Sequence, residues 1–142
     1  MNIYIVNGPN LNLLGKREKT WYGNKSFSSF LQELQNTYTQ AKINYFQSNS
    51  EGDLINHLHQ IGFSAHGIIL NAGGYTHSSI ALSDAIRAIS ADVIEVHISN
   101  IYKRESYRQH SYLSAHVLGT ITGLGLEVYR LALEYFLSIP RP

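Results

Sequence analysis

The stretch Gly67-Ile-Ile-Leu-Asn-Ala-Gly-Gly-Tyr-Thr-His77 joins a short apolar run to a polar turn that is rich in glycine. The run at 67–70 is typical of a strand that is buried on both faces. The two glycines predict a tight turn into a helix over Ser78–Ile89, for which Thr76 or Ser78 would be the N-terminal cap. A buried strand that leads directly into a helix is the repeating unit of a parallel α/β sheet.

The same alternation of strands and helices continues along the chain in both directions. Right-handed crossovers between parallel strands leave few possible topologies, and 142 residues suffice for one domain. We therefore predict an α/β fold, a flavodoxin-like three-layer sandwich with a five-stranded parallel sheet. The other predicted strands are Ile3–Val6, Ile43–Phe46, Val93–Val96 and Leu118–Thr122, and the other predicted helices are Phe27–Thr39 after a Ser26 cap, Glu51–Ile61 and Leu126–Leu137.

The composition excludes several classes of protein. A net charge of +1 without a basic run gives nucleic-acid binding little electrostatic support. No apolar run approaches the ~20 residues of a membrane span, and Met1–Val6 lacks the features of a signal peptide, so a cytoplasmic location is expected. The chain has no cysteine, which excludes disulfides and thiolate ligands. Charged residues make up only 15% of the chain, which predicts surface buried against partner subunits.

Polar side chains follow three of the predicted strands where each strand ends. In an open parallel sheet these carboxyl ends share one edge, and ligands bind beyond it. The convergence therefore predicts a catalytic site at this edge. The residues concerned are Asn7, Asn10 and Asn12 after the first strand, Asn71, Gly73, Gly74 and His77 after the third, and Glu95, His97, Ser99 and Asn100 at the fourth.

Glu95 and His97 lie two residues apart, on the same face of a strand. One interpretation is a general acid whose ring is oriented by a carboxylate. The alternative is a core histidine that is satisfied by a backbone carbonyl. The backbone amides of Ile98 and Ser99, which follow directly, are suited to receive a carboxylate group.

The long loop from Gly8 to Lys25 is a candidate lid. Loops longer than ~12 residues in a compact domain are usually functional or disordered. Arg17 lies five residues before Tyr22, and a nearby guanidinium favours the phenolate form that a catalytic base requires. The alternative is an ordinary surface loop with a solvated arginine and a packing tyrosine.

Two further pairs of residues have simpler explanations than a binding site. His57 and His59 are two residues apart on a predicted helix, point to different faces and cannot chelate one metal ion, so no metal site is expected. Arg104 and Arg108 are four residues apart and would share a helical face, where they could bind a polyol or an anion. The alternative for this pair is two solvated surface charges.

The ordered set of motifs resembles the type II 3-dehydroquinate dehydratases. The resemblance runs from residue 2 to about residue 137 and includes motif order and spacing. It implies a flavodoxin-like fold and a cofactor-free elimination of water from 3-dehydroquinate, giving 3-dehydroshikimate through an enolate. The motifs are Asn7-Gly-Pro-Asn-Leu-Asn12, Arg17-Glu18 with Tyr22-Gly23, Asn71-Ala-Gly-Gly-Tyr-Thr-His77 and Glu95-Val-His-Ile-Ser-Asn100.

The resemblance also implies roles for individual residues. Tyr22 matches the family's proton acceptor, and Arg17 its essential arginine. His97 matches the proton donor, and Glu95 its orienting partner. Asn12 matches the residue that positions a water molecule near the enolate oxygen.

A second set of positions matches substrate-binding residues of the family, namely Asn71, Gly74, His77, Ile98, Ser99, Arg104 and Arg108. Asp84 matches an acid contributed by a neighbouring subunit, since the family assembles as a homo-oligomer, a dodecamer of trimers. The alternative for Asp84 is a surface aspartate paired with Arg87. One departure is Lys19, where members often have proline after the Arg-Glu pair.

The expected role is the biosynthesis of chorismate and the aromatic amino acids, and the sequence also allows other functions. The same reaction also serves quinate catabolism. A flavodoxin-like fold without turnover would be a binding module for a small molecule or for FMN. The type I dehydratases use a lysine imine in a (β/α)8 barrel of ~250 residues, for which this chain is too short.

Overall fold

A five-stranded parallel sheet forms the centre of the computed structural model, which describes residues 1–16 and 25–141. The strand order is β2-β1-β3-β4-β5, the flavodoxin-like order, and the predicted fold class is confirmed. The strands are β1 (Asn2–Asn7), β2 (Lys42–Gln47), β3 (Gly67–Asn71), β4 (Val93–His97) and β5 (Gly119–Thr122).

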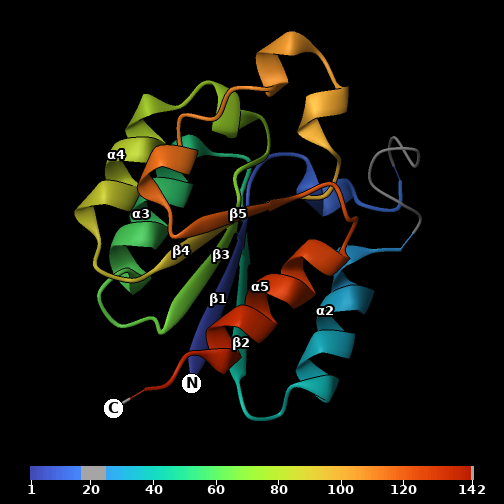
Figure 1. The fold of residues 1–142 in the computed structure, drawn as a ribbon, viewed down its shortest axis with the longest axis vertical. Helices are drawn as coiled ribbons and strands as arrows, with labels where there is room; N and C mark the ends of the chain where they lie inside the picture. The colour runs from blue at the N-terminus through green and yellow to red at the C-terminus, as the bar shows by residue number, and fades with distance from the viewer. Residues whose placement is uncertain (17–24, 142) are drawn as a thin grey trace.

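Within the described residues, four α-helices cover the two faces of this sheet (Figure 1). Helices α2 (Phe27–Thr37) and α5 (Glu127–Ser138) lie together on one face, and α3 (Glu51–Ile61) and α4 (Ile80–Ala88) lie on the other. Each face has its own apolar core. Phe30 and Leu133 pack in the core under α2 and α5, while Leu58 and Leu82 pack in the core under α3 and α4.

The helix after β3 begins later than the sequence predicts, and the predicted cap is wrong. Residues Gly73–His77 form a 3₁₀ helix instead of a simple turn, and α4 starts only at Ile80. The capping side chain is Ser79, whose hydroxyl accepts a hydrogen bond from the Leu82 amide at 2.9 Å. Thr76 and Ser78, the expected caps, belong instead to this 3₁₀ helix and to its C-terminal end. Elsewhere the boundaries agree closely, although α2 ends at Thr37 and not at Thr39, and its Ser26 cap is confirmed.

The carboxyl ends of β1 and β3 are pressed tightly together. Asn7 pairs with Asn71 in the register of the two strands, and the Gly8 amide donates to the Asn71 carbonyl at 2.7 Å. A Cβ at residue 8 would lie 2.4 Å from the Ala72 carbonyl oxygen, so only glycine permits this approach. The two chain segments therefore leave the sheet side by side and form one rim above it.

A long irregular segment connects β4 to β5 and runs across this rim (Figure 1). It contains three short 3₁₀ helices, Ile101–Lys103, Ser106–Arg108 and Ser114–His116. It is anchored at several points, because Leu113 is fully buried in the core under α4, and the Tyr112 amide donates to the Thr76 carbonyl. Within 1–16 and 25–141, no helix is long and apolar enough to cross a membrane.

Candidate active site

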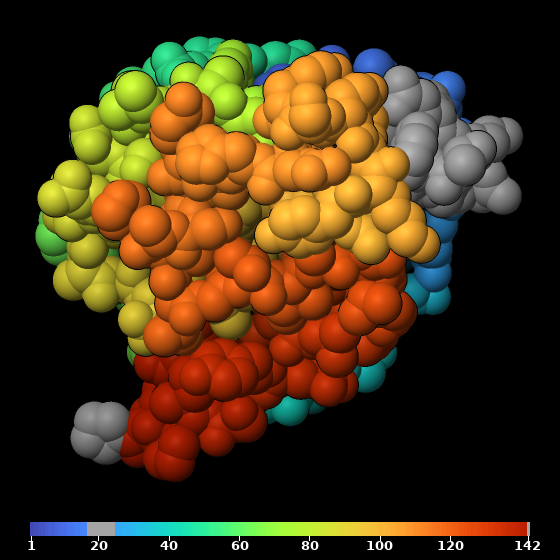
Figure 2. Space-filling model, turned by 45° about the horizontal axis from the view of Figure 1, so that its top comes forward, coloured from blue at the N-terminus to red at the C-terminus, as the bar shows by residue number. Residues whose placement is uncertain are grey.

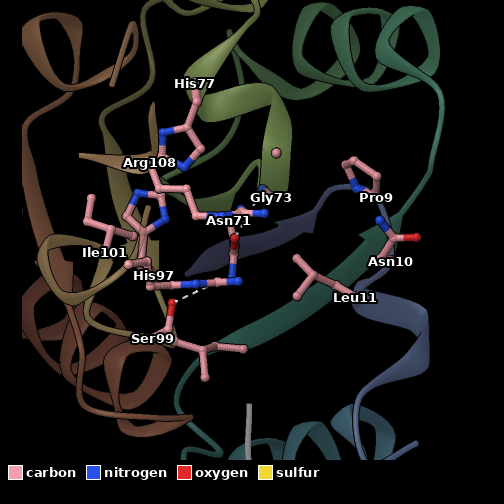
Figure 3. Close-up of a pocket in the computed structure, with 13 residues that line it drawn as sticks. Pro9, Asn10, Leu11, Asn71, Gly73, His77, His97, Ser99, Ile101 and Arg108 are labelled. Carbon is pink, nitrogen blue, oxygen red and sulfur yellow. Dashed lines mark hydrogen bonds between the residues drawn. The ribbon is translucent and has the colours of Figure 1, made fainter. Parts of the chain in front are cut away.

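A polar cavity lies at the carboxyl ends of β1, β3 and β4, where the sequence predicts the site. It has about 560 Å³ of empty space, which includes open solvent at its mouth. In Figure 3, Pro9, Asn10 and Leu11 face His97 and Ser99 across the cavity. The full lining is Pro9, Asn10, Leu11, Asn71, Gly73, Gly74, His77, His97, Ile98, Ser99, Ile101, Arg104 and Arg108.

The predicted pair of Glu95 and His97 is present at the end of β4. His97 Nε2 and Glu95 Oε2 are 2.5 Å apart, and Glu95 is only 1% exposed. A carboxylate oxygen can only accept, so Nε2 of His97 carries the hydrogen. The prediction that a carboxylate orients the His97 ring is confirmed. The alternative, in which a backbone carbonyl accepts the ring hydrogen, is wrong for Nε2.

Glu95 remains ionised although it is buried. Burial by itself would raise its pKa, but the hydrogen bond and positive charge of His97 act in the opposite direction, as do the hydroxyls of Ser114 and Ser111. Together they hold the pKa of Glu95 below the ordinary value of 4.5. A negative charge is therefore maintained next to Nε2 of the His97 ring.

Ser111 and Ser114 were not singled out from the sequence. Both hydroxyls donate to Glu95 Oε1, at 3.1 Å and 2.9 Å respectively. They lie 16 and 19 positions after Glu95 in irregular chain, so no periodic pattern relates them to it. Only the path of the connecting segment over the rim brings them to the carboxylate.

His77 approaches the cavity with a defined tautomer. Its Nδ1 is 2.8 Å from the His110 carbonyl oxygen, which can only accept, so Nδ1 carries the hydrogen. Burial lowers the pKa of His77, an effect that the His110 carbonyl opposes and that the charge of His97 reinforces. The ring is therefore neutral at pH 7 and has Nε2 available as an acceptor for a ligand hydroxyl. Its plane lies over that of His97, with 6.2 Å between ring centroids.

Two arginines place positive charge on the wall of the cavity. Arg104 Nη1 donates to the Ser99 hydroxyl at 3.2 Å, the bond that is dashed in Figure 3. The Arg104 side chain is only 6% exposed, so the alternative of a solvated surface charge is wrong for this residue. Arg108 donates from Nε to Glu105 Oε2 at 2.8 Å. Arg104 follows the 3₁₀ helix Ile101–Lys103 and Arg108 ends the 3₁₀ helix Ser106–Arg108, so the two do not share one helical face.

Asn71 is held from below by a buried network. The Asn71 side-chain amide donates to the Tyr129 hydroxyl at 2.9 Å, and that hydroxyl donates to Asn7 Oδ1 at 2.8 Å. Asn71 Oδ1 in turn accepts from the Gly73 amide at 3.2 Å. Burial strongly raises the pKa of Tyr129, so its hydroxyl stays protonated and can act as the donor to Asn7. The sequence gives no signal for this role of Tyr129, which occupies one of the apolar positions of an amphipathic helix.

The glycine turn after β3 forms the edge of the cavity. Gly73 has φ of +59°, a conformation that side chains strongly disfavour. A Cβ on Gly74 would meet no atom within 4 Å, so the backbone there is open to a ligand, as the sequence predicts.

Several predicted site residues lie elsewhere. Asn12 is exposed and does not line the cavity. Asp84 is exposed on α4, with its Oδ1 3.9 Å from Arg87 Nη1, the pairing considered as the alternative for this residue. Arg17 and Tyr22 lie outside the described residues. In the part of the chain that the structure covers, no three His, Cys, Asp or Glu side chains gather closely enough to hold a metal ion.

Comparison with known proteins gives a consistent result. The sequence matches the profile of the family described as dehydroquinase class II over residues 1–137. A 3-dehydroquinate dehydratase from an Exiguobacterium species is 52% identical over 135 residues, which cover 94% of this chain and 92% of that protein. The 3-dehydroquinate dehydratase of Bacillus pumilus is 49% identical over 136 residues, with the same coverage. The crystal structure of type II dehydroquinase from Butyrivibrio crossotus superposes with a TM-score of 0.93 at 38% identity, covering 97% of this chain and 98% of that one.

Proposed function

Because this chain belongs to the class II dehydroquinase family, we propose that its rim cavity removes water from 3-dehydroquinate and releases 3-dehydroshikimate. The activity is that of a 3-dehydroquinate dehydratase, a hydro-lyase whose substrate is a small molecule. The observation that carries the assignment to this cavity is the His97 ring, which lines it and is hydrogen-bonded to the buried, ionised Glu95. Residues 1–142 act as one catalytic domain.

The reaction requires a base and an acid. The hydrogen that leaves is α to a ketone, so its removal produces an enolate. The C1–O bond then breaks as the hydroxyl takes up a proton and departs as water, leaving a conjugated enone. A base strong enough for the first step is the phenolate of Tyr22, which Arg17 favours through its permanent positive charge.

His97 is the proton donor for the second step. Its Nε2 is occupied by Glu95, so Nδ1 is the ring nitrogen that exchanges a proton with the bound molecule. The Glu95 carboxylate stabilises the protonated ring before the transfer and fixes its orientation. Proton transfer from a positioned side chain typically contributes about 10²–10⁴ in rate.

The remaining wall of the cavity is suited to a hydroxylated carboxylic acid. The neutral His77 offers Nε2 to a substrate hydroxyl. Arg104 and Ser99, together with the backbone amides at Ile98 and Ser99, are suited to the substrate carboxylate. Asn71 and Arg108 bind the other polar edge of the substrate, and the open backbone at Gly74 lets it approach the turn.

Two further residues, Asn12 and Asp84, act on the substrate although neither lines the cavity of its own chain. Asn12 positions a water molecule that stabilises the enolate oxygen. Asp84 is exposed and outside its own cavity, which fits a residue that reaches the site of a neighbouring chain in a dodecamer built from trimers. Large apolar side chains are exposed at Tyr102, Leu124 and Leu131, as an interface requires. A cytoplasmic location and a place in the shikimate pathway accompany this proposal.

A direct test is an ultraviolet assay for the conjugated enone, with purified protein and 3-dehydroquinate. We expect turnover that follows substrate concentration and is lost in His97→Gln. Substrate binding without turnover would instead indicate the non-catalytic binding module. Whether the organism uses the reaction for biosynthesis or for quinate breakdown is then decided by growth of a deletion strain without aromatic amino acids.

A further inference from the structure

We propose that Ser114, together with Ser111, is a positioning residue that holds the Glu95 carboxylate ionised and aimed at His97. The inference rests on the proposed function, in which His97 is the proton donor. It extends the site from the two residues of β4 to the segment that crosses the rim. Neither serine lines the cavity, so both act through Glu95 and not on the substrate.

The two oxygens of Glu95 have separate tasks. Oε2 accepts the hydrogen of His97 Nε2, while Oε1 accepts from the hydroxyls of Ser111 and Ser114. Glu95 is 1% exposed, so its carboxylate depends on hydrogen-bond donors from the protein. A buried carboxylate with too few donors favours its protonated form. The two serines therefore supply donors on the side of the carboxylate that His97 does not reach.

Ser111 is built into the turn as well as bonded to the carboxylate. Its oxygen accepts from the amides of Leu113 and Ser114, at 3.0 Å and 3.1 Å, while its own hydrogen is donated to Glu95. Accepting two hydrogen bonds polarises the hydroxyl and strengthens its donation. Replacing Ser111 would disturb the turn itself, so its loss would mix two effects.

Ser114 allows a cleaner experiment. The hydrogen bond of its hydroxyl is to Glu95 Oε1, and the residue is exposed at the start of the 3₁₀ helix Ser114–His116. Truncation to alanine therefore opens no cavity in the core. Threonine keeps the hydroxyl, and its extra methyl group has room at an exposed position.

The segment that carries the serines is held firmly in place. Figure 2 shows residues of about 100–118, in yellow-orange to orange, covering the face of the molecule above the red helix α5. Its course is fixed by the buried Leu113 and by the bond from the Leu118 amide to the Val93 carbonyl. The bond between His77 Nδ1 and the His110 carbonyl joins the same segment to the second histidine of the cavity. The hydroxyls are therefore delivered by a fixed backbone.

Among residues 1–16 and 25–141, three charged or titratable side chains lie around the cavity beside the pair of Glu95 and His97. His77 faces His97 from the 3₁₀ helix Gly73–His77, and Arg104 and Arg108 face the cavity from the segment above it. The arginines keep their charge at every accessible pH. Removing a serine donor therefore acts on the ionisation of Glu95 itself, and acid pH is where the effect emerges.

The test compares Ser114→Ala and Ser114→Thr with the wild type, and uses Ser138→Ala as a matched control. Ser138 lies at the far end of α5, where its hydroxyl bonds to the Tyr135 carbonyl. In Ser114→Ala we expect the acid limb of the kcat profile that reflects Glu95 to move to higher pH by about half to one unit. Relative to the wild type, kcat should therefore fall by up to roughly threefold to tenfold at the acid end of the profile, below pH 4.5, and change little near pH 7.5. KM should stay within about twofold, because the substrate is not touched. Ser114→Thr should restore the wild-type profile, and Ser138→Ala should not alter it.

A readout without turnover separates this inference from the proposed function. A carbon-13 titration of labelled glutamate carboxyl groups follows Glu95, assigned by its absence in Glu95→Gln. We expect the midpoint of Glu95 to rise in Ser114→Ala. An unchanged midpoint, with a kcat profile that keeps its wild-type shape, would overturn the positioning role of Ser114. A wild type without dehydratase activity would contradict the proposed function, while the titration would still decide the role of the serine.

Discussion

Replacing Tyr129 by phenylalanine removes one oxygen atom from beneath the cavity and leaves the aromatic ring in place. The ring is fully buried, with an edge contact to Phe27 at 4.9 Å between centroids. The apolar packing is therefore preserved. What is lost is the hydroxyl that accepts from Asn71 and donates to Asn7, two side chains that are themselves 4% and 0% exposed.

The cost follows from the groups that are left without a partner. The side chains of Asn7 and Asn71 each lose one hydrogen-bond partner, at about 1–3 kcal/mol per buried polar group, which together would cost about 2–6 kcal/mol of stability. The fold no longer has to bury the hydroxyl, which returns about 1–3 kcal/mol. We therefore expect Tyr129→Phe to lower the free energy of unfolding by roughly 1–3 kcal/mol, which a domain with about 5–15 kcal/mol survives.

The assay is urea unfolding followed by far-ultraviolet circular dichroism, at one fixed protein concentration because subunit association adds to apparent stability. The matched control is Tyr135→Phe, the same chemical change on the same helix at a side chain that is 48% exposed. It should stay within about 0.5 kcal/mol of the wild type. Because Asn71 lines the cavity, KM for dehydroquinate should also rise in Tyr129→Phe alone. If both variants unfold alike, the hydroxyl network does not hold Asn71 and the reasoning fails.

Four further predictions concern the chemistry and the assembly. Tyr22→Phe and Arg17→Ala should each lower kcat by about 10²–10⁴ or more with the fold intact by circular dichroism, and near-normal turnover in Tyr22→Phe would refute the assignment of the base. Activity should survive exhaustive EDTA treatment, and borohydride with substrate should neither inactivate the enzyme nor add substrate mass to any lysine, as mass spectrometry will check. When inactive Tyr22→Phe and Asp84→Ala chains are unfolded together and reassembled, the mixture should regain part of the activity. A mixture that is no more active than the separate variants would mean that Asp84 does not act across an interface. The pKa of Glu95 is lower in the folded protein than the ordinary value of 4.5, so its contribution to stability is present above pH 4.5 and is lost as the pH falls through the folded pKa. Urea unfolding across a pH series should therefore show a steeper loss of stability in acid for the wild type than for Glu95→Gln. Parallel curves for the two proteins would argue against an ionised Glu95.

The buried strands and amphipathic helices could be predicted from the sequence because their patterns are local. Apolar runs such as 67–70 and helical spacings such as those of Glu51–Ile61 depend on the geometry of the element alone. Right-handed crossovers left few possible strand orders, and the flavodoxin-like order was the one chosen among them. The pairing of Glu95 with His97 followed from the two-residue period of a strand, which puts both side chains on one face. The site at the strand ends could be predicted because the carboxyl ends of parallel strands share one edge of the sheet.

Only the tertiary structure decided which residues far apart in the chain are in contact. Ser114 reaches Glu95 across 19 positions, and Tyr129 reaches Asn7 across 122. Neither residue belongs to a pattern that distinguishes it from any other serine or from any other apolar helix position. The burial of Arg104 was equally invisible, because it depends on how an irregular segment is anchored over the rim. Local periodicity determines secondary structure, but the partners of a polar side chain depend on which segments the packed core brings together, and in this protein that determines which donors reach the buried carboxylate.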